Sequence, residues 1–454
     1  MLPIPPARGG ARDLGATAVF AEALAALAVT AYLWQWGGVS LESALLLPAP
    51  ALLAGVLVVR ERRRGIPSPS LLPLGLALNL LGLTVLAVIA PYFYRLQAAW
   101  SCLAVAVYAL SSWRRLPRGW PIAYSFRLYA FSLVLVLLTF IVGTNPSGAG
   151  PKQWLALGAF YFQPSELLKL GLILMLGKQL GEGPGEQADR HLWLPAAAAG
   201  GLLLVAQGDL GATLVFTGIA ALVYYSGSGR WRPLVGGVFI LALLGVLAYA
   251  FVPHVRARFG SWLNPWRDPL GSSYQVLQGL RAIAEGGVFG KGLATPDSVH
   301  VPASHTDLIV SAVGERLGLA GSLGVLAAFA LLLWRLGELG SRAQSEPWAL
   351  VCLGVAALLV GQGALIVGGA TALLPLTGVT LPFVSYGGSS LLVSYLALGL
   401  LEGTAITTAG SPRRAGNRRA IYLALAASLL LLALWLSAWH LFGTSILAGR
   451  LAGA

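Results

Sequence analysis

The sequence has little charge. Only 10% of its 454 residues are Asp, Glu, Lys or Arg, whereas soluble proteins contain about 25%. Hydrophobic residues make up 57%, and apolar runs long enough for a helix to cross a bilayer recur along most of the chain. This composition excludes a soluble globular protein, and continuous apolar runs exclude a β-barrel, whose strands alternate apolar and polar residues. The chain is predicted to be an all-α polytopic membrane protein.

Cysteine and histidine are also scarce. The two cysteines, Cys102 and Cys352, lie in apolar runs, so no structural disulfide is expected. Three of the five histidines fall in the stretch 253–306, with a spacing that matches no metal motif. Residues 1–13 lack the pattern of a cleaved signal peptide, so the first apolar segment is expected to be a retained helix.

The positive charges indicate an orientation in the membrane. With the N-terminus inside, 20 of the 30 Lys and Arg residues lie on the cytoplasmic side, eight lie outside and two lie within spans. The net charge of +13 is distributed in short clusters between spans, which argues against a nucleic-acid partner. Thirteen membrane helices are predicted, at roughly 14–36, 40–59, 69–91, 95–112, 121–143, 158–180, 191–207, 209–226, 232–252, 307–334, 347–368, 385–408 and 419–443.

The longest outer loop of this topology spans 253–306. Loops of this length in compact proteins are usually functional or disordered, and this one is rich in aromatic residues and glycine. Its segment Gly286–Gly292 has the glycine density of a phosphate-binding loop without the spacing of a known fingerprint. The loop is therefore where chemistry is expected.

A carboxylate, Asp307, stands where this loop re-enters the membrane. A charge at membrane depth costs about 2.5–3.5 kcal/mol on insertion scales. Asp307 suits either a helix N-cap or a chemical role. Glu166 and Lys169 are three residues apart, share a helix face, and form either an orienting ion pair or part of a site. For Asp209, in the turn between two apolar runs, capping and a role in the site are equally open.

Several motifs occur in a fixed order. They are FQPSELLKL from Phe162, DLG from Asp209, NPWRDPLG from Asn264, YQVLQ from Tyr274, GGVFGKG from Gly286, HTD from His305 and LPFVSYGGSS from Leu381. This ordered set, over residues 69–408, resembles the SEDS family (shape, elongation, division and sporulation), which includes RodA and FtsW. The resemblance implies a ten-helix core at 67–410 with one large outer loop. Two further membrane helices lie in 1–66 and one more in 411–454.

The resemblance also implies a function: a peptidoglycan glycosyltransferase that polymerises lipid II at the outer face of the cytoplasmic membrane. The family's essential aspartate matches Asp307, and its Glu and Lys match Glu166 and Lys169. A class B penicillin-binding protein, which would supply cross-linking, is the expected partner, together with membrane lipids. The remaining expected substrate contacts are the basic pair Arg256 and Arg258, and His305, Thr306, Ser385 and Tyr386 in the last motifs.

The chemistry of polymerisation assigns roles to these groups. A sugar hydroxyl is a poor nucleophile, so Asp307 would accept its proton as general base, and direct displacement would invert the anomeric centre. The leaving diphosphate needs cations, for which Lys152, Lys291, Lys169 and the two arginines are candidates. No cofactor is firmly expected. The sequence leaves open whether a divalent cation (Mg²⁺ or Mn²⁺) binds between the diphosphate and Asp307, although it contains no recognisable set of metal ligands.

The sequence departs from the family at three informative positions. Gln153 replaces an Arg, Ala303 replaces a Glu, and Ile366 stands where the eleventh helix usually has Asn. Two alternatives to a polymerase are a flippase or transporter for a lipid-linked precursor, and a non-catalytic scaffold of cell-wall synthesis. Asp307 discriminates between polymerase and flippase, because only the polymerase needs it. The sequence does not distinguish elongation, division and sporulation.

Overall fold

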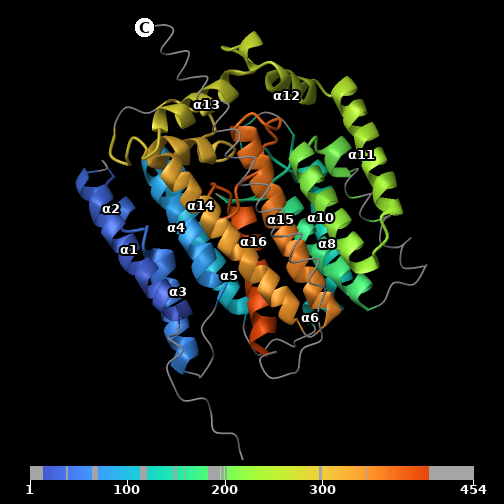
Figure 1. Cartoon of the computed structure of the whole chain (residues 1–454), viewed down its shortest axis with the longest axis horizontal. Coiled ribbons are helices and arrows are strands. Elements are labelled where there is room, and N and C mark those ends of the chain that lie inside the picture. Colours follow the sequence, from blue (N-terminus) through green and yellow to red (C-terminus); the bar gives the residue numbers. More distant parts are fainter. Residues whose placement is uncertain are drawn as a thin grey trace, which may run out of the picture.

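The computed structural model is a bundle of long helices, with short helices and loops over one end (Figure 1). We call the end that carries α12 and α13 the cap end. The predicted helix 419–443 and the rest of 411–454 lie outside the described residues. The structure describes residues 14–36, 39–63, 70–112, 120–146, 148, 151–158, 160–182, 195, 199, 202–295, 299–343 and 345–407.

The first two membrane passes form a unit at one edge of the bundle. α1 (Leu14–Trp36) packs on α3 (Ala49–Arg63), with the short α2 (Leu41–Ala44) between them, and the pair lies against α4 (Leu72–Ile89) and α5 (Pro91–Ser111) (Figure 1). Alanines of α1 and α3 are buried, which lets the helices approach closely. At the cap end, the Tyr94 hydroxyl of α5 donates a 2.8 Å hydrogen bond to the Ser43 carbonyl of α2.

The remaining long helices form the body of the bundle. They are α7 (Ser125–Val142), preceded by the short α6 (Trp120–Ala123), α8 (Pro164–Gly181), α10 (Leu210–Ser228), α11 (Arg232–Phe251), α14 (Ile309–Arg342), α15 (Glu346–Ala370) and α16 (Gly388–Thr407), with a π-helical turn at Leu202–Ala206. α5 packs on α16, α8 on both α7 and α15, and α14 on α15. Within the described residues, eight spans are long and apolar enough to cross a membrane. The prediction of a polytopic, all-helical membrane fold is confirmed.

One predicted helix begins in the wrong place. Residues 158–163 were expected to open a membrane helix, but Leu155–Leu157 (β1) pairs with Phe160–Phe162 (β2) as a small antiparallel hairpin. α8 starts only at Pro164, where proline suits the first helical turn because its missing N–H has no partner there. Periodicity alone does not separate a short apolar strand from the start of a helix.

The long loop 253–306 is partly helical. It contains α12 (Pro253–Leu263), a 3₁₀ turn (Pro265–Arg267) and α13 (Tyr274–Gly286), which packs along α14. Its glycine-rich segment lies on the backbone of α14: the Lys291 amide donates to the Glu315 carbonyl at 2.9 Å, and the Gly292 amide to the Arg316 carbonyl at 3.0 Å. The glycines permit this close approach, so these amides hold the loop on the bundle.

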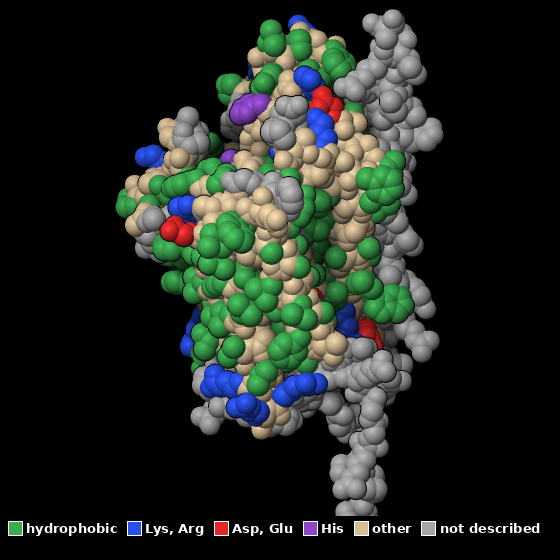
Figure 2. Space-filling view, turned by 90° about the vertical axis from the view of Figure 1, so that its left-hand side faces the viewer, with side chains coloured by type: hydrophobic (Ala, Val, Ile, Leu, Met, Phe, Trp, Pro, Cys, Tyr) green, Lys and Arg blue, Asp and Glu red, His purple; other side chains and the backbone are tan. Residues whose placement is uncertain are grey.

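The two ends of the bundle differ in charge. Figure 2 shows a group of Lys and Arg side chains at the end opposite the cap, with a belt of hydrophobic side chains between the two ends. α3 finishes at that end with Arg60, Arg62 and Arg63 in its last turn. Such an arrangement is typical of a protein that crosses a membrane with a basic cytoplasmic side.

Candidate functional site

Asp307 lies in a short loop directly before α14, at the cap end. The loop is tied to the segment that precedes α16: the Tyr386 amide donates to the His305 carbonyl at 2.8 Å, and the Ser385 hydroxyl donates to the Thr306 carbonyl at 2.8 Å. Ser385 also accepts from the Leu381 amide at 2.9 Å. The two motifs HTD and LPFVSYGGSS, far apart in sequence, therefore form one structure that fixes the backbone of Asp307.

Asp307 does not cap the helix that follows it. The residue before the first turn of α14 is Leu308, and no side chain bonds the free amides there. Asp209, by contrast, caps α10, since its Oδ1 accepts from the Ala212 amide at 2.8 Å. The structure gives no support to the cap interpretation of Asp307, and its chemical role stays a prediction.

Arg258 of α12 is the cation beside Asp307. Gly378, which has φ +78°, lies against both groups: a Cβ there would be 3.4 Å from Nη2 of Arg258 and 3.7 Å from Oδ2 of Asp307. A Cβ at 378 would therefore be in van der Waals contact with both groups, and a residue with a side chain rarely adopts this φ. Glycine at 378 lets the segment before α16 pass close to the carboxylate and the guanidinium.

The pKa of Asp307 is raised from 3.8 to about 6. Protein atoms crowd the carboxyl and cause most of the increase, while part of the residue stays accessible. Arg258 and the hydrogen bond from Thr306 lower the pKa, and the nearby Asp209 raises it. A carboxylate with a pKa near 6 is ionised at neutral pH yet basic enough to take a proton, as a general base requires.

Asp209 is a second carboxylate of the site. Its Oδ2 accepts a 3.4 Å hydrogen bond from Gln163, and its pKa is raised by burial, raised further by Glu166 and lowered by Lys169 and Arg258. The structure thus gives Asp209 both of the roles that the sequence left open. It caps α10 and it belongs to the charged centre.

Glu166 and Lys169 form a buried ion pair on α8. Lys169 Nζ is 2.7 Å from Oε1 of Glu166, and the two residues are 1% and 6% exposed. Gln362 of α15 donates to Oε2 of Glu166 at 3.3 Å. Gln362 lies one helical turn before Ile366, so an amide reaches the pair although position 366 is apolar. Sequence reasoning missed Gln362, whose only signal was a polar residue inside a long apolar run.

An aromatic group flanks the other side of the His305–Asp307 loop. The ring of Phe93, in α5, stacks on His305 with centroids 4.0 Å apart and planes at 9°, and Tyr386 lies 4.9 Å from Phe93. Burial lowers the pKa of His305, which favours the neutral imidazole. Phe93 also escaped the sequence analysis, although it sits in the aromatic run Tyr92–Tyr94 at the start of a helix.

Three predicted phosphate contacts lie elsewhere. Arg256 donates to the carbonyls of Tyr249 and Ala250 at the end of α11. Lys291 pairs with Glu285 and lies 3.5 Å from Glu315 under the glycine-rich loop. Lys152 is exposed beside the β-hairpin. In the described structure, the site therefore assembles Arg258 and Lys169 and not these three cations.

Two departures from the family pattern have visible consequences. Gln153 donates to the Gln207 carbonyl at 3.0 Å and so ties the β-hairpin to the segment before Asp209. Ala303 has φ +53°, and its carbonyl accepts from the Thr306 amide at 3.1 Å. Both residues support the backbone around the site and leave the two aspartates in place.

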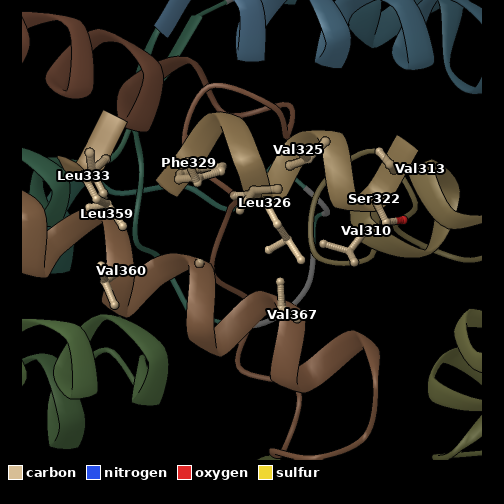
Figure 3. A pocket seen from close by; sticks show the side chains of 12 residues that line it. Val310, Val313, Ser322, Val325, Leu326, Phe329, Leu333, Leu359, Val360 and Val367 are labelled. Carbon is tan, nitrogen blue, oxygen red and sulfur yellow. The ribbon is translucent and has the colours of Figure 1, made fainter. Parts of the chain in front are cut away.

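An apolar pocket runs between α14 and α15, beginning near Asp307 at Val310 and Val313 (Figure 3). Valine, leucine and phenylalanine side chains line it, with Ser322 as its one hydroxyl. Its chemistry suits a hydrocarbon chain and does not suit a sugar or a phosphate. The pocket is thus separate from the charged centre.

Metal binding stays a prediction. Within the residues that the structure describes, no three His, Cys, Asp or Glu side chains are grouped so as to hold an ion. Asp209 lies close enough to Asp307 for its charge to raise the pKa of Asp307. A divalent ion there would need oxygen ligands from a bound diphosphate.

The fold and the site define a class: a multi-pass membrane protein with a paired-aspartate, cation-lined centre at one end. A sequence model of the family described as cell cycle protein (FtsW, RodA and SpoVE) matches residues 85–409. The chain therefore belongs to this family, the SEDS family that its motifs indicated. Residues 14–63, which hold α1 to α3, precede the matched region.

Named relatives and solved structures agree with this assignment. The chain is 35% identical to stage V sporulation protein E of Bacillus subtilis over 60% of this chain and 75% of that one. It is 32% identical to the probable peptidoglycan glycosyltransferase FtsW of Geobacter metallireducens (71% and 87% covered). It is 33% identical to the peptidoglycan glycosyltransferase RodA of Mycobacterium bovis (67% and 68%).

Two solved structures share the fold. One is described as "Structural coordination of polymerization and crosslinking by a peptidoglycan synthase complex". It is 33% identical to this chain with a TM-score of 0.64, and the match covers 75% of this chain and 98% of that one. The other is the rod shape determining protein RodA of Thermus thermophilus, which is 30% identical to this chain with a TM-score of 0.57. The match covers 75% of this chain and 97% of that one.

Proposed function

We propose that this chain is a peptidoglycan glycosyltransferase that polymerises lipid II, with Asp307 as the general base. The observation that carries the proposal is Asp307 itself: a partly accessible carboxylate of raised pKa that caps no helix and lies beside Arg258. The FtsW and RodA relatives bear the name of this activity. The chain is accordingly an enzyme that joins lipid-linked disaccharides.

The charges of the site fit the two partners of the reaction. The acceptor hydroxyl gives its proton to Asp307 as its oxygen bonds to the anomeric carbon of the donor, and the bond to the lipid diphosphate breaks. Arg258 is placed to neutralise the diphosphate as negative charge grows on it. Lys169 acts from further inside by offsetting the charges of Glu166 and Asp209. One carboxylate and direct displacement give inversion.

The surroundings fit a substrate that is half lipid. The site lies at the cap end of membrane helices, so a sugar diphosphate bound there would keep its hydrocarbon tail in the bilayer. We place the cap end outside the cytoplasmic membrane and the N-terminus inside, because the opposite end carries the basic residues of α3. We also propose a class B penicillin-binding protein as partner, in keeping with the synthase complex that shares this fold.

The proposal is tested with purified full-length protein and lipid II. We expect wild type to make glycan strands and Asp307→Ala and Asp307→Asn to make none. Asp268→Asn is the matched control, because Asp268 is an exposed carboxylate of the same cap that bonds Ser272 and lies outside the site. It should retain activity.

Three outcomes would contradict the proposal in different ways. Equal product from wild type and both Asp307 variants would remove Asp307 as the base. Absence of product from wild type, with lipid II moved across vesicles, would identify a flippase. Neither activity, with retained binding of a penicillin-binding protein, would identify a scaffold.

A further inference from the structure

Aromatic side chains from three separate elements meet next to the proposed base. Tyr92 and Phe93 come from the start of α5, Tyr161 from β2, and Tyr386 from the segment before α16. Tyr92 packs edge-on against Phe93 with centroids 5.3 Å apart, and Phe93 lies 4.9 Å from Tyr386. Tyr161 lies at the start of α16, because the Ser389 hydroxyl, three residues after Tyr386, donates to the Tyr161 carbonyl at 3.4 Å. We call these four residues the aromatic shelf.

The aromatic shelf is accessible and is joined to the base. Tyr92 is 70% exposed and Tyr161 38%. Phe93 stacks on His305, two residues before Asp307, and the Tyr386 amide bonds the His305 carbonyl. Arg258 and Asp209 approach Asp307 from other elements, α12 and the start of α10. Asp307 therefore stands between a charged region and an aromatic one.

Displacement at a sugar carbon needs two binding regions. The attacking hydroxyl and the leaving diphosphate lie on opposite sides of the anomeric carbon, and the base must touch only the attacking sugar. The diphosphate belongs with Arg258, because charge-assisted hydrogen bonds to a guanidinium are its strongest partners. The acceptor sugar needs a surface that reaches Asp307 without offering a cation. The aromatic shelf meets both conditions.

The chemistry of the aromatic shelf suits a sugar ring. A pyranose presents a face of C–H groups that packs on an aromatic ring and a rim of hydroxyls that exchange hydrogen bonds with tyrosine. On the basis of the proposed function, we infer that Tyr92, Tyr161 and Tyr386 form the acceptor subsite. This subsite would hold the sugar that gives its proton to Asp307, and Phe93 would support it by packing against Tyr92 and Tyr386.

The competing explanation is an interfacial aromatic belt, in which tyrosines mark the edge of the bilayer. A belt residue contacts lipid and does not affect one substrate more than the other. The two explanations are separated by measuring donor and acceptor saturation independently. A lipid-linked disaccharide whose acceptor hydroxyl is chemically blocked can serve only as donor. One whose diphosphate is replaced by a link that cannot leave can serve only as acceptor, so each concentration can be varied while the other is fixed.

We would measure both saturation curves for wild type, Tyr92→Ala, Tyr161→Ala and a control, Tyr225→Ala. Tyr225 is 43% exposed near the far end of α10, opposite the cap. We expect each aromatic-shelf variant to raise the apparent KM for acceptor about three- to tenfold, a loss typical of one aromatic contact, with the donor KM unchanged. The control should match wild type in both.

The contrary results are distinct. A rise in the donor KM alone would make the aromatic shelf a donor subsite, and unchanged curves in active variants would make it a belt. Either result overturns the acceptor subsite while leaving the proposed function intact. Wild-type protein that makes no glycan would instead overturn the proposed function.

Discussion

Asp307 is held in a position where its charge is costly. Burial raises its pKa from 3.8 to about 6, so the folded protein binds this proton more tightly than the unfolded chain does. The free energy of unfolding therefore decreases as pH rises between these two values and stays lower above them. Under the proposed mechanism, this loss of stability accompanies a carboxylate that can act as a base at neutral pH.

This cost predicts opposite effects of one substitution. Asp307→Asn should abolish glycan synthesis and yet raise the free energy of unfolding at pH 8 by about 1 kcal/mol, after allowing for the accessible part of the residue. At pH 4 the gain should nearly vanish, since most of the cost of the charge is absent there. Unfolding of the detergent-solubilised protein at both pH values measures this. A variant that is less stable than wild type at pH 8 would show that the carboxylate is stabilising.

The ion pair of α8 gives a second prediction. Lys169→Met alone should lower the free energy of unfolding by about 3–5 kcal/mol, because it leaves the Glu166 charge buried without its partner. Adding Glu166→Gln should restore most of this stability. We expect the double variant to fold and still lack glycan synthesis, since the site has then lost the cation that we propose to offset negative charge there. A fully active double variant would mean that the pair only orients the helix.

The residues of the site were predictable to different degrees. Asp307, Glu166 and Lys169 are charged residues in apolar stretches of the sequence. Such residues are rare in membrane proteins and usually have a functional role, so the sequence alone singles them out. Arg258 and Arg256 are two positions apart on α12, and sequence does not show which one turns toward Asp307. Gln362 and Gly378 matter only through contacts with segments far away in the chain, which no local pattern records.

At the scale of elements, α14 is held by a special backbone at Gly318. This residue has φ +67°, and a Cβ there would lie 2.3 Å from the Gly290 amide nitrogen and 2.5 Å from the Val288 carbonyl oxygen. The kink at Gly318 and the glycine-rich loop thus fit each other directly. A side chain at 318 would push the loop away from the helix.

We therefore expect Gly318→Ala to lower the free energy of unfolding by at least about 1–2 kcal/mol, the cost of a left-handed backbone for a residue with a Cβ. The loop 287–295 should become more sensitive to protease. Gly324→Ala is the control, because a Cβ at this position in α14 meets nothing within 4 Å. It should be neutral or stabilising. Equal behaviour of the two variants would contradict the close fit.

Element boundaries show where a sequence stops being informative. The long helices were found because twenty apolar residues in succession have one common solution in a membrane. The hairpin of β1 and β2 was missed because three-residue apolar strands look like the start of the helix behind them. α12 and α13 were not anticipated inside 253–306, since their packing against α11 and α14 is set by the fold and not by a local sequence pattern.

The whole molecule is polarised, with the site at the cap end and a basic group at the other. If both native cysteines are replaced by serine, a single cysteine at exposed Leu270 in the cap should react with an impermeant thiol reagent on intact cells. A single cysteine at exposed Ser345, between α14 and α15, should react only after permeabilisation. The reverse pattern would invert the proposed orientation.

The position of Asp307, in the loop at the cap end of the membrane helices, has a consequence for what happens after the proposed bond forms. The acceptor keeps its own lipid anchor in that reaction, so the lengthened glycan stays attached to the membrane, and the carrier that the donor releases is a lipid as well. Both products therefore keep a hydrocarbon chain among the acyl chains and a polar part in water. A reaction centre at the end of the bundle lets the released carrier leave sideways through the bilayer while the carbohydrate extends into the aqueous phase.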